Sequence, residues 1–179
     1  VFLTNKQGAR IHINGTVAPI RADRDSYAGQ ALAFRDVTAL KRMSDTIVYQ
    51  ASHDALTGLI NRDEFFSQLD DVARATIEDG RRHTFAYIDL DQFKVINDVC
   101  GHYAGDELLR QVSQAIQDTL RSNFVIGRLG GDEFGVVLMD CPLDQAYERA
   151  TDVLDAVRRK FIWHKHSFNV SASIRSEER

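Results

Sequence analysis

Two stretches of sequence decide the fold: Phe85-Ala86-Tyr87-Ile88-Asp89-Leu90-Asp91 and Gly130-Gly131-Asp132-Glu133-Phe134. The first is apolar until two acids end it, which predicts a strand whose carboxylates two positions apart point the same way. The second lies between apolar runs at 124–129 and 134–138, and its glycines permit the positive φ of a tight hairpin turn. If the hairpin neighbours the first strand, the acids of the turn meet Asp89.

This arrangement predicts a divalent metal site. The carboxylate of Asp89, the backbone carbonyl of Leu90 and the acids Asp132 and Glu133 are oxygen ligands of the kind that suits Mg²⁺ or Mn²⁺. A cluster of carboxylates repels itself unless cations are present, which favours a bound metal. Each motif alone has a plainer interpretation, because a solvated strand end and an ordinary turn are both common.

The rest of the second part predicts an α+β fold. Helical stripes begin near Phe65 and Leu108, and they alternate with β-like runs at 85–90, 124–129 and 134–138. A further helix over 143–161 and a strand over 168–174 complete the pattern. The order is βαββαβ behind a leading helix, which indicates one sheet backed by helices.

Residues 1–37 favour short antiparallel strands followed by a helix. Turns are expected at Gln7-Gly8, at Asn14-Gly15 and over 23–25. Between residues 36 and 53 the period becomes helical, with Asp36 or Thr38 as the cap and a narrow apolar stripe of Leu40, Met43 and Ile47. A narrow stripe suits a two-helix seam, and the alternative is a surface helix packed on its own domain.

Composition excludes several classes of protein. The chain has 179 residues, 44% apolar and 27% charged, with a net charge of −4, values typical of one ordinary globular domain with a short extra piece. It lacks the basic stripe of a nucleic-acid-binding protein and the run of roughly 20 apolar residues needed to span a membrane. Two isolated cysteines favour a reducing cytosol, so a cytoplasmic location is expected. The chain begins without Met, and we expect it to be a fragment.

A possible base-recognition site follows the first strand. Residues 93–106 read as a loop that opens a helix at Glu107, and they contain Asn97 and Asp106. An amide and a carboxylate complement the hydrogen-bonding edge of guanine. The alternatives are a helix N-cap at Asp106 and a turn residue at Asn97.

Five separated motifs together resemble the GGDEF family of diguanylate cyclases over residues 45–174. They are the Gly130–Phe134 turn with Arg128 before it, Asp54-Ala55-Leu56-Thr57-Gly58-Leu59-Ile60-Asn61-Arg62, Asp89-Leu90-Asp91-Gln92-Phe93-Lys94, Asn97-Asp98, and Gly101-His102-Tyr103-Ala104-Gly105-Asp106. Residues 1–38 are similar to the last strands of a PAS sensor domain, and residues 39–53 to the signalling helix that leaves it. The GGDEF domain would then occupy residues 54–179 and be truncated at its C-terminus.

The resemblance implies a palm-like, nucleotidyl cyclase-like fold with a defined set of site residues. Asp89, Leu90, Asp132 and Glu133 would bind the metal, and Asp132 and Glu133 would be catalytic. The GTP-binding residues would be Phe93, Lys94, Asn97, His102, Asp106, Gly130 and Gly131. Asp54 and Arg128 would form a structural ion pair.

The implied activity condenses two GTP into cyclic di-GMP and two pyrophosphates across a homodimer, without nucleic acid or membrane contact by this segment. The family usually continues beyond Ile174 with a helix whose basic residues touch the triphosphate, whereas here Arg175-Ser176-Glu177-Glu178-Arg179 closes the sequence. The rival hypothesis is a GTP-binding regulatory module that controls a downstream cyclic di-GMP phosphodiesterase domain. Intact acids at Asp89, Asp132 and Glu133 favour the enzyme.

Overall fold

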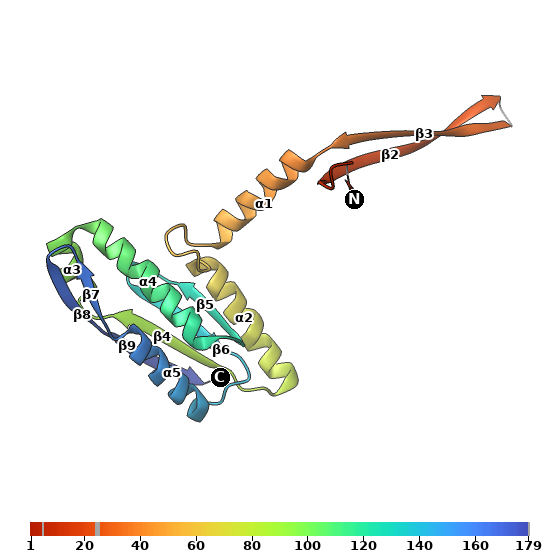
Figure 1. Ribbon diagram of the computed structural model, residues 1–179. Coiled ribbons are helices and arrows are strands. Elements are labelled where there is room, and N and C mark those ends of the chain that lie inside the picture. The colour runs from red at the N-terminus through yellow and green to blue at the C-terminus, as the bar shows by residue number, and fades with distance from the viewer. Residues whose placement is uncertain (5, 24–25, 179) are drawn as a thin grey trace. The chain divides into compact units, whose positions relative to one another are not determined.

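The computed structural model describes residues 1–4, 6–23 and 26–178, and it divides the chain into two compact units. Unit 1 comprises Val1–Ala51 and unit 2 comprises Ser52–Arg179 (Figure 1). Across the described residues, no helix is both long and apolar enough to cross a bilayer.

Unit 1 contains an antiparallel sheet in the order β1-β2-β3, built from β1 (Phe2–Thr4), β2 (Arg10–Asp23) and β3 (Ser26–Asp36). The turn at Gln7-Gly8 is confirmed, with Gly8 at a φ of 82°. The turn expected at Asn14-Gly15 is wrong, because both residues lie inside β2 opposite β3. Apolar and β-branched neighbours on both sides carry the strand through this pair. The third expected turn includes residues 24 and 25, which lie outside the described residues.

Helix α1 (Thr38–Ser52) begins directly after β3. The N-cap position is Val37, whose carbonyl accepts from the Lys41 N–H, but the carboxylate of Asp36 accepts a hydrogen bond from the backbone N–H of Thr38 at 2.8 Å and so satisfies a donor of the first turn. A hydrogen bond from the Thr38 side chain, followed by this backbone bond, lowers the pKa of Asp36. No residue of α1 is buried, and Leu40, Met43 and Ile47 are each about two-thirds exposed. The apolar stripe of α1 is therefore open to a partner.

Unit 2 has a four-stranded antiparallel sheet in the order β5-β6-β4-β9. Its strands are β4 (Thr84–Leu90), β5 (Phe124–Arg128), β6 (Glu133–Leu138) and β9 (Ala172–Glu178). The helices are α2 (Arg62–Asp79), α3 (Phe93–Cys100), α4 (His102–Leu120) and α5 (Leu143–Val157). A separate two-stranded sheet pairs β7 (Arg159–Trp163) with β8 (His166–Val170). The predicted α+β class and the sheet backed by helices are confirmed.

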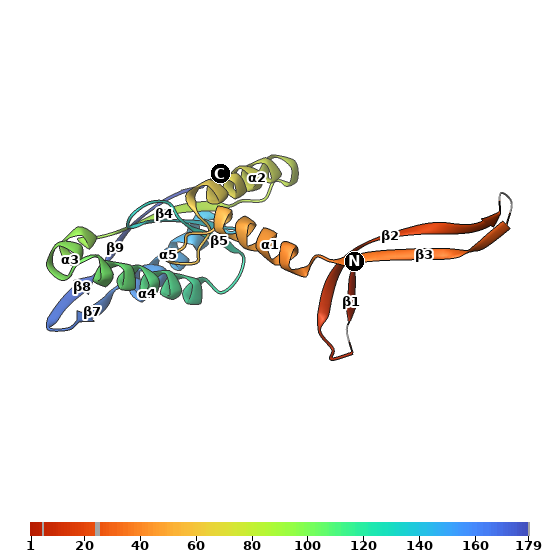
Figure 2. The same cartoon turned by 90° about the horizontal axis from the view of Figure 1, so that it is seen from above.

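The two faces of the large sheet support different packing. Alternate residues of β4, from Thr84 to Leu90, are buried, and the apolar ones, Ala86, Ile88 and Leu90, belong to the main core with α4 and α5. The intervening residues Phe85 and Tyr87 face the other way and join a smaller core with Phe65 of α2. Figure 2 accordingly shows α2 and α4 on opposite sides of the strands. The odd-numbered positions of β4, which end at Asp89, therefore lie on the α2 side.

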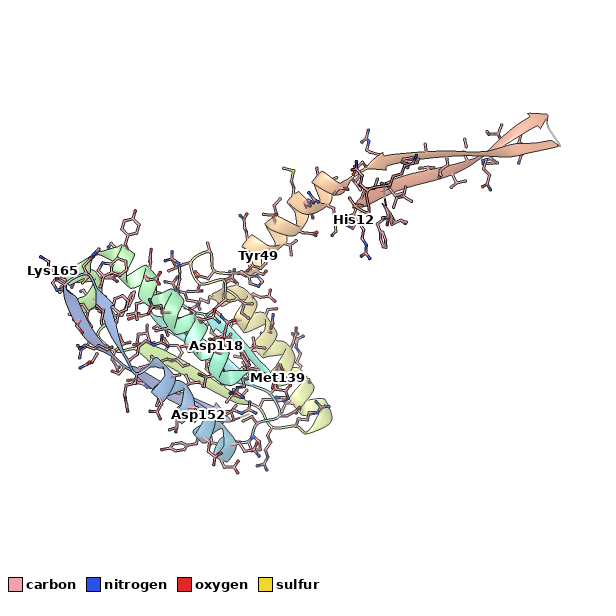
Figure 3. The ribbon with its side chains drawn as sticks, in the orientation of Figure 1. His12, Tyr49, Asp118, Met139, Asp152 and Lys165 are labelled. Carbon is pink, nitrogen blue, oxygen red and sulfur yellow. The ribbon has the colours of Figure 1, made fainter. Side chains whose placement is uncertain are left out.

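Two parts of the expected pattern need correction. The expected helix over 143–161 ends at Val157, and the expected strand over 168–174 is two strands, β8 and β9. Residues 159–163 form β7, in which Phe161 is buried while its neighbours Lys160 and Ile162 are exposed, a period of two that favours a strand. His164 has a φ of 51° in the turn between β7 and β8, where Figure 3 shows Lys165.

A pair of glycines makes room for the aromatic ring that joins α2 to the sheet. Gly127 of β5 lies opposite Gly135 of β6, and a Cβ on either would lie 2.6–2.8 Å from ring atoms of Phe65. Phe65 is fully buried in this slot. The paired glycines thus allow α2 to pack directly on the hairpin that carries the Gly130–Glu133 turn.

We predict that Gly135→Ala and Gly127→Ala each lower the free energy of unfolding by about 1–3 kcal/mol, because the added methyl group overpacks the ring of Phe65. Urea unfolding measures the change. Gly131→Ala is the matched control, since its Cβ would meet no described atom within 4 Å. Equal losses in all three variants would contradict the slot.

Candidate active site

The acids of the two motifs meet where the two central strands of the sheet, β4 and β6, end together, a region called here the acidic edge. β4 and β6 pair antiparallel in a register that places Asp89 opposite Glu133 and Tyr87 opposite Gly135. Directly opposed residues on neighbouring strands share a face, so the two carboxylates lie together on the α2 side. The predicted meeting of the first strand with the hairpin is confirmed.

Backbone hydrogen bonds close the Gly130–Glu133 turn and join it to the end of β4. Leu90 N–H donates to the Asp132 carbonyl at 3.2 Å, and Leu129 N–H donates to the Glu133 carbonyl at 2.9 Å. A Cβ on Gly130 would lie only 2.8 Å from Oε2 of Glu133. Glycine at position 130 therefore lets the Glu133 carboxylate fold back over the turn.

The electrostatics of this edge favour a cation. Burial, followed by the negative charges of Asp132, Glu133 and Asp91, raises the pKa of Asp89, while Arg175 opposes the rise. The Tyr87 hydroxyl hydrogen-bonds to Glu133, and this bond, with burial and the adjacent charges, raises the pKa of Tyr87 to about 12. Tyr87 therefore stays protonated and can donate its hydroxyl hydrogen to the Glu133 side chain.

The donor set fits a hard divalent ion. Among the residues described, no three His, Cys, Asp or Glu side chains are grouped closely enough to hold a metal by themselves. Mg²⁺ needs only one or two carboxylates, with waters and substrate phosphates completing its shell. Asp89, the Leu90 carbonyl and Glu133 could supply that set at one strand end, and the negative charges of Asp132, Glu133 and Asp91 around Asp89 are of the sign that attracts a cation.

An ion pair fixes the base of the turn. Arg128 Nη1 lies 3.2 Å from both carboxylate oxygens of Asp54, and Arg128 Nη2 donates to the Gly131 carbonyl at 2.7 Å. Asp54 also accepts from the backbone and side chain of Thr57. Burial alone would raise the pKa of Asp54, but the Thr57 hydrogen bonds and the Arg128 charge outweigh it and lower the pKa. The ion pair implied by the family resemblance is confirmed.

Of the residues expected to bind the nucleotide, those between 93 and 106 lie on helices α3 and α4, not in the predicted loop, whereas Gly130 and Gly131 lie in the turn before β6. Asn97 belongs to α3, whereas Asp106 lies inside α4, which begins at His102, so the N-cap alternative for Asp106 is wrong. Asn97 Oδ1 approaches Gly105 so closely that a Cβ there would clash. The structure therefore brings Asn97 beside the residue that precedes Asp106.

Three other expected ligands differ in exposure. Phe93 is partly buried against the main core, and its ring lies 3.0 Å from the position of a Cβ on Gly105. Lys94 and His102 are exposed. Phe93 thus contributes packing between α3 and α4, while Lys94 and His102 are accessible to a ligand.

Sequence reasoning missed two groups of this site. Tyr87 contacts Glu133, and its signal was its place two residues before Asp89 on the same strand face. Arg62 donates through Nη1 to the Leu129 carbonyl at 3.3 Å, just before the turn. A contact between residues 67 positions apart has no local sequence signal.

A family model described as diguanylate cyclase, GGDEF domain, matches residues 51–176. The chain belongs to the GGDEF domain family. The match spans the whole large sheet except the last residues of β9, together with every acid of the candidate site.

Relatives and solved structures agree with this assignment. A probable diguanylate cyclase, DgcE of Escherichia coli, is 40% identical over 97% of this chain, which spans 16% of that protein. A cyclic di-GMP phosphodiesterase, PdeB of Shewanella oneidensis, is 37% identical over 72% of the chain and 14% of its own length. The coiled coil and GGDEF domain of DgcB from Caulobacter crescentus, solved with c-di-GMP, superposes with a TM-score of 0.75 at 25% identity, covering 80% of this chain and 77% of that one. The chain therefore spans only a small part of the curated relatives it matches.

We predict that Asp54→Asn lowers the free energy of unfolding of the GGDEF domain by about 1–3 kcal/mol at pH 7, because it weakens charge-assisted hydrogen bonds in a site where Asp54 is only 24% exposed. The pKa of Asp54 is lower in the folded than in the unfolded protein, where it is near 3.8. Its stabilisation is therefore complete well above pH 3.8 and is lost as the pH falls through the folded pKa. Denaturant titrations at several pH values measure the difference from wild type, which should shrink below pH 3.8.

Asp71→Asn is the control for this prediction. Asp71 pairs with Arg74 on α2 at 3.0 Å, but its side chain is 71% exposed. The free energy of unfolding should change by no more than about 0.5 kcal/mol. A loss in Asp54→Asn that matches this control would show that the pair with Arg128 does not hold the turn.

Proposed function

We propose that this protein is a diguanylate cyclase that condenses two GTP molecules into cyclic di-GMP. The observation that carries the proposal is the register of β4 and β6, which sets Asp89 opposite Glu133 beside a turn opened by Gly130. The 3′-hydroxyl of one GTP attacks the α-phosphate of the other and breaks its bond to the β-phosphate, releasing pyrophosphate. A second, reciprocal attack closes the ring.

The chain's own residues place charge where this reaction needs it. We assign Asp89, the Leu90 carbonyl and Glu133 as the groups that hold Mg²⁺ or Mn²⁺, with Asp132 as the further acid that would turn toward the bound ion. The bound ion would neutralise the leaving pyrophosphate and assist ionisation of the 3′-hydroxyl. Tyr87 keeps the Glu133 carboxylate oriented, and Asp132 and Glu133 are the candidate proton acceptors.

Gly130 and Gly131 support close approach of a phosphate to the turn. A Cβ on Gly131 would meet no described atom within 4 Å, so its backbone is open on that side. In this proposal the exposed side chains of Lys94 and His102 make further contacts with the nucleotide. Phe93 lies next to Lys94 on α3.

The guanine base is assigned to Asn97 and Asp106. Within the described part of the chain, Asn97 Oδ1 is a buried acceptor without a hydrogen-bond partner. Buried acceptors of this kind are costly unless a donor satisfies them, and guanine carries N1–H and 2-amino donors. The unsatisfied amide beside Gly105 supports a ligand with such donors.

Two active sites must face each other for the reciprocal attack, and we assign the helix at 39–53 to bringing them together. The apolar stripe of α1 is exposed at Leu40, Met43 and Ile47. Spacings of three and four residues suit a two-helix seam between copies of the chain. The solved DgcB structure includes a coiled coil, in agreement with this role.

We further propose that residues 1–38 are the closing strands of a PAS-like sensor domain and that the GGDEF domain begins at Asp54. The β2–β3 ribbon pairs Val17 with Leu32 and Gly15 with Phe34, so their side chains share one face. Val17, Leu32 and Phe34 are more than half exposed. A two-stranded ribbon with an open apolar face suits a larger sheet that covers it.

The second candidate is a regulatory GTP-binding module that controls a cyclic di-GMP phosphodiesterase domain. The similarity to the phosphodiesterase PdeB favours it, because this chain matches a small part of that longer protein. The two functions differ in product, since only the cyclase turns GTP into cyclic di-GMP.

We predict that the full-length protein with GTP and Mg²⁺ produces cyclic di-GMP and that Asp89→Asn or Glu133→Gln lowers its production at least about 100-fold, the loss typical of removing a group that stabilises transition-state charge. Mass spectrometry measures the product. Asp118→Asn, an exposed change on α4 (Figure 3), is the control. Without metal, Asp89→Asn should be at least as stable as wild type, because it removes like-charge repulsion. GTP binding without product would favour the regulatory module.

We predict a preference for GTP over ATP of at least about tenfold, or about 1.4 kcal/mol, because adenine leaves the base-reading groups unpaired. Asn97→Ala should reduce this preference, whereas Asn169→Ala, an exposed change on β8, should leave it unchanged. Calorimetric titration with both nucleotides measures it. Equal affinities in wild type would mean that Asn97 and Asp106 do not read the base.

A further inference from the structure

Asp91 has a different environment from its neighbour Asp89, although both acids end the same strand. Its Oδ2 accepts a hydrogen bond from Ser171 Oγ at 2.6 Å, and its Oδ1 accepts one from Ser173 Oγ at 2.9 Å. Its backbone N–H donates to the Ser171 carbonyl at 2.9 Å. Both carboxylate oxygens are thus engaged by the segment that leads into β9.

One of the serines that hold Asp91 also lies opposite the end of β4 that carries the proposed metal ligands. Ser173 lies opposite Asp89 in the β4–β9 register, and Ala172 lies opposite Leu90. The bonds of Asp91 therefore bind together the strand end that carries the Asp89 carboxylate and the Leu90 carbonyl. They act at the point where β4 stops and strand pairing with β9 begins.

Asp91 also stands at a strained junction between β4 and α3. Gln92, the next residue, has a φ of 61° and precedes α3, a left-handed conformation that is uncommon for a residue other than glycine. Such conformations persist only where the surrounding structure over-determines them. The three hydrogen bonds of Asp91 supply that constraint, and α3 then carries Asn97 in a fixed direction from the strand end.

We infer that Asp91 is a positioning residue, clamped by Ser171 and Ser173, that aligns Asp89 and the Leu90 carbonyl for a divalent ion. This role rests on the proposed cyclase function. The hydroxyl donors satisfy Asp91 without cancelling its negative charge, which therefore still adds to the attraction of this edge for a cation. An arginine or lysine in their place would hold Asp91 but remove that attraction.

Because the donors to Asp91 are uncharged hydroxyls, removing them changes the alignment of Asp89 and the Leu90 carbonyl without changing the charge of the site. The double variant Ser171→Ala/Ser173→Ala in the full-length protein removes both donors and leaves every carboxylate in place. Ser173→Ala alone changes an exposed residue and guards against misfolding of the double variant. Ser173→Thr keeps a hydroxyl at the same strand position. Ser176→Ala, an exposed serine of β9 opposite Ala86, is the matched control.

Electron paramagnetic resonance of Mn²⁺ titrated into each variant, with and without GTP, gives a readout independent of turnover. We expect Mn²⁺ affinity to fall about three- to tenfold in the double variant and by a smaller factor in Ser173→Ala, with wild-type affinity in Ser173→Thr and Ser176→Ala. The metal concentration that gives half-maximal cyclase activity should rise in parallel, while activity at saturating metal recovers most of its wild-type value.

Three results would overturn the inference. If wild type binds both GTP and Mn²⁺ but the double variant remains within twofold of it, the clamp does not position the site, whatever its effect on melting temperature. If Ser173→Thr loses affinity as Ser173→Ala does, the hydroxyl is not the cause. If wild type binds neither GTP nor Mn²⁺, the proposed function fails, and the positioning role fails with it.

Discussion

The antiparallel register of β4 against β6 is the constraint on which the rest of unit 2 depends. Six residue pairs, from Thr84 with Leu138 to Asp89 with Glu133, fix it. Side chains on a strand alternate between faces, so a slip of one residue would turn Asp89 toward the main core and expose the positions of Ile88 and Leu90. The burial of alternate β4 side chains against α4 and α5 therefore also sets the direction of the acids. Core packing and site geometry are consequences of one register.

Two contacts distant in sequence from β4 hold the hairpin in that register. Phe65 of α2 enters the slot between Gly127 and Gly135, and Asp54 pairs with Arg128 immediately before the turn. Both contacts come from residues 54–65. Phe65 packs on the face of the hairpin away from α4, whereas Arg128 lies opposite Phe134 at the end of β5 that leads into the turn. The turn at Gly130–Glu133 is thus carried on a hairpin anchored at its base, while its acids remain at the solvent-accessible end.

Much of this arrangement could be predicted from sequence because it depends on local patterns. The apolar run ending in Asp89 and the glycines before Asp132 predict the strand and the turn, and the family resemblance adds the Asp54–Arg128 pair. Tertiary packing decided what was missed. Residues 93–100 form α3 because Phe93 and Ile96 pack on the main core, although the polar residues among them indicated a loop. The pairing of β7 with β8 and the bonds of Ser171 and Ser173 to Asp91 join residues that no short window of sequence relates.

The two units differ in where their apolar side chains are exposed. In unit 2 the apolar side chains of β4 and β6 are buried in two cores. Polar groups occupy the acidic edge that carries Asp89 and Glu133. In unit 1 the reverse holds: the stripe of α1 and the face of the β2–β3 ribbon leave Leu40, Ile47, Leu32 and Phe34 exposed. Burial of exposed apolar surface drives association, whereas clustered carboxylates oppose it unless cations are bound. Unit 1 is therefore the part whose exposed apolar surface favours association, and in the proposed cyclase the acidic edge of unit 2 would meet its counterpart with metal and nucleotide between them.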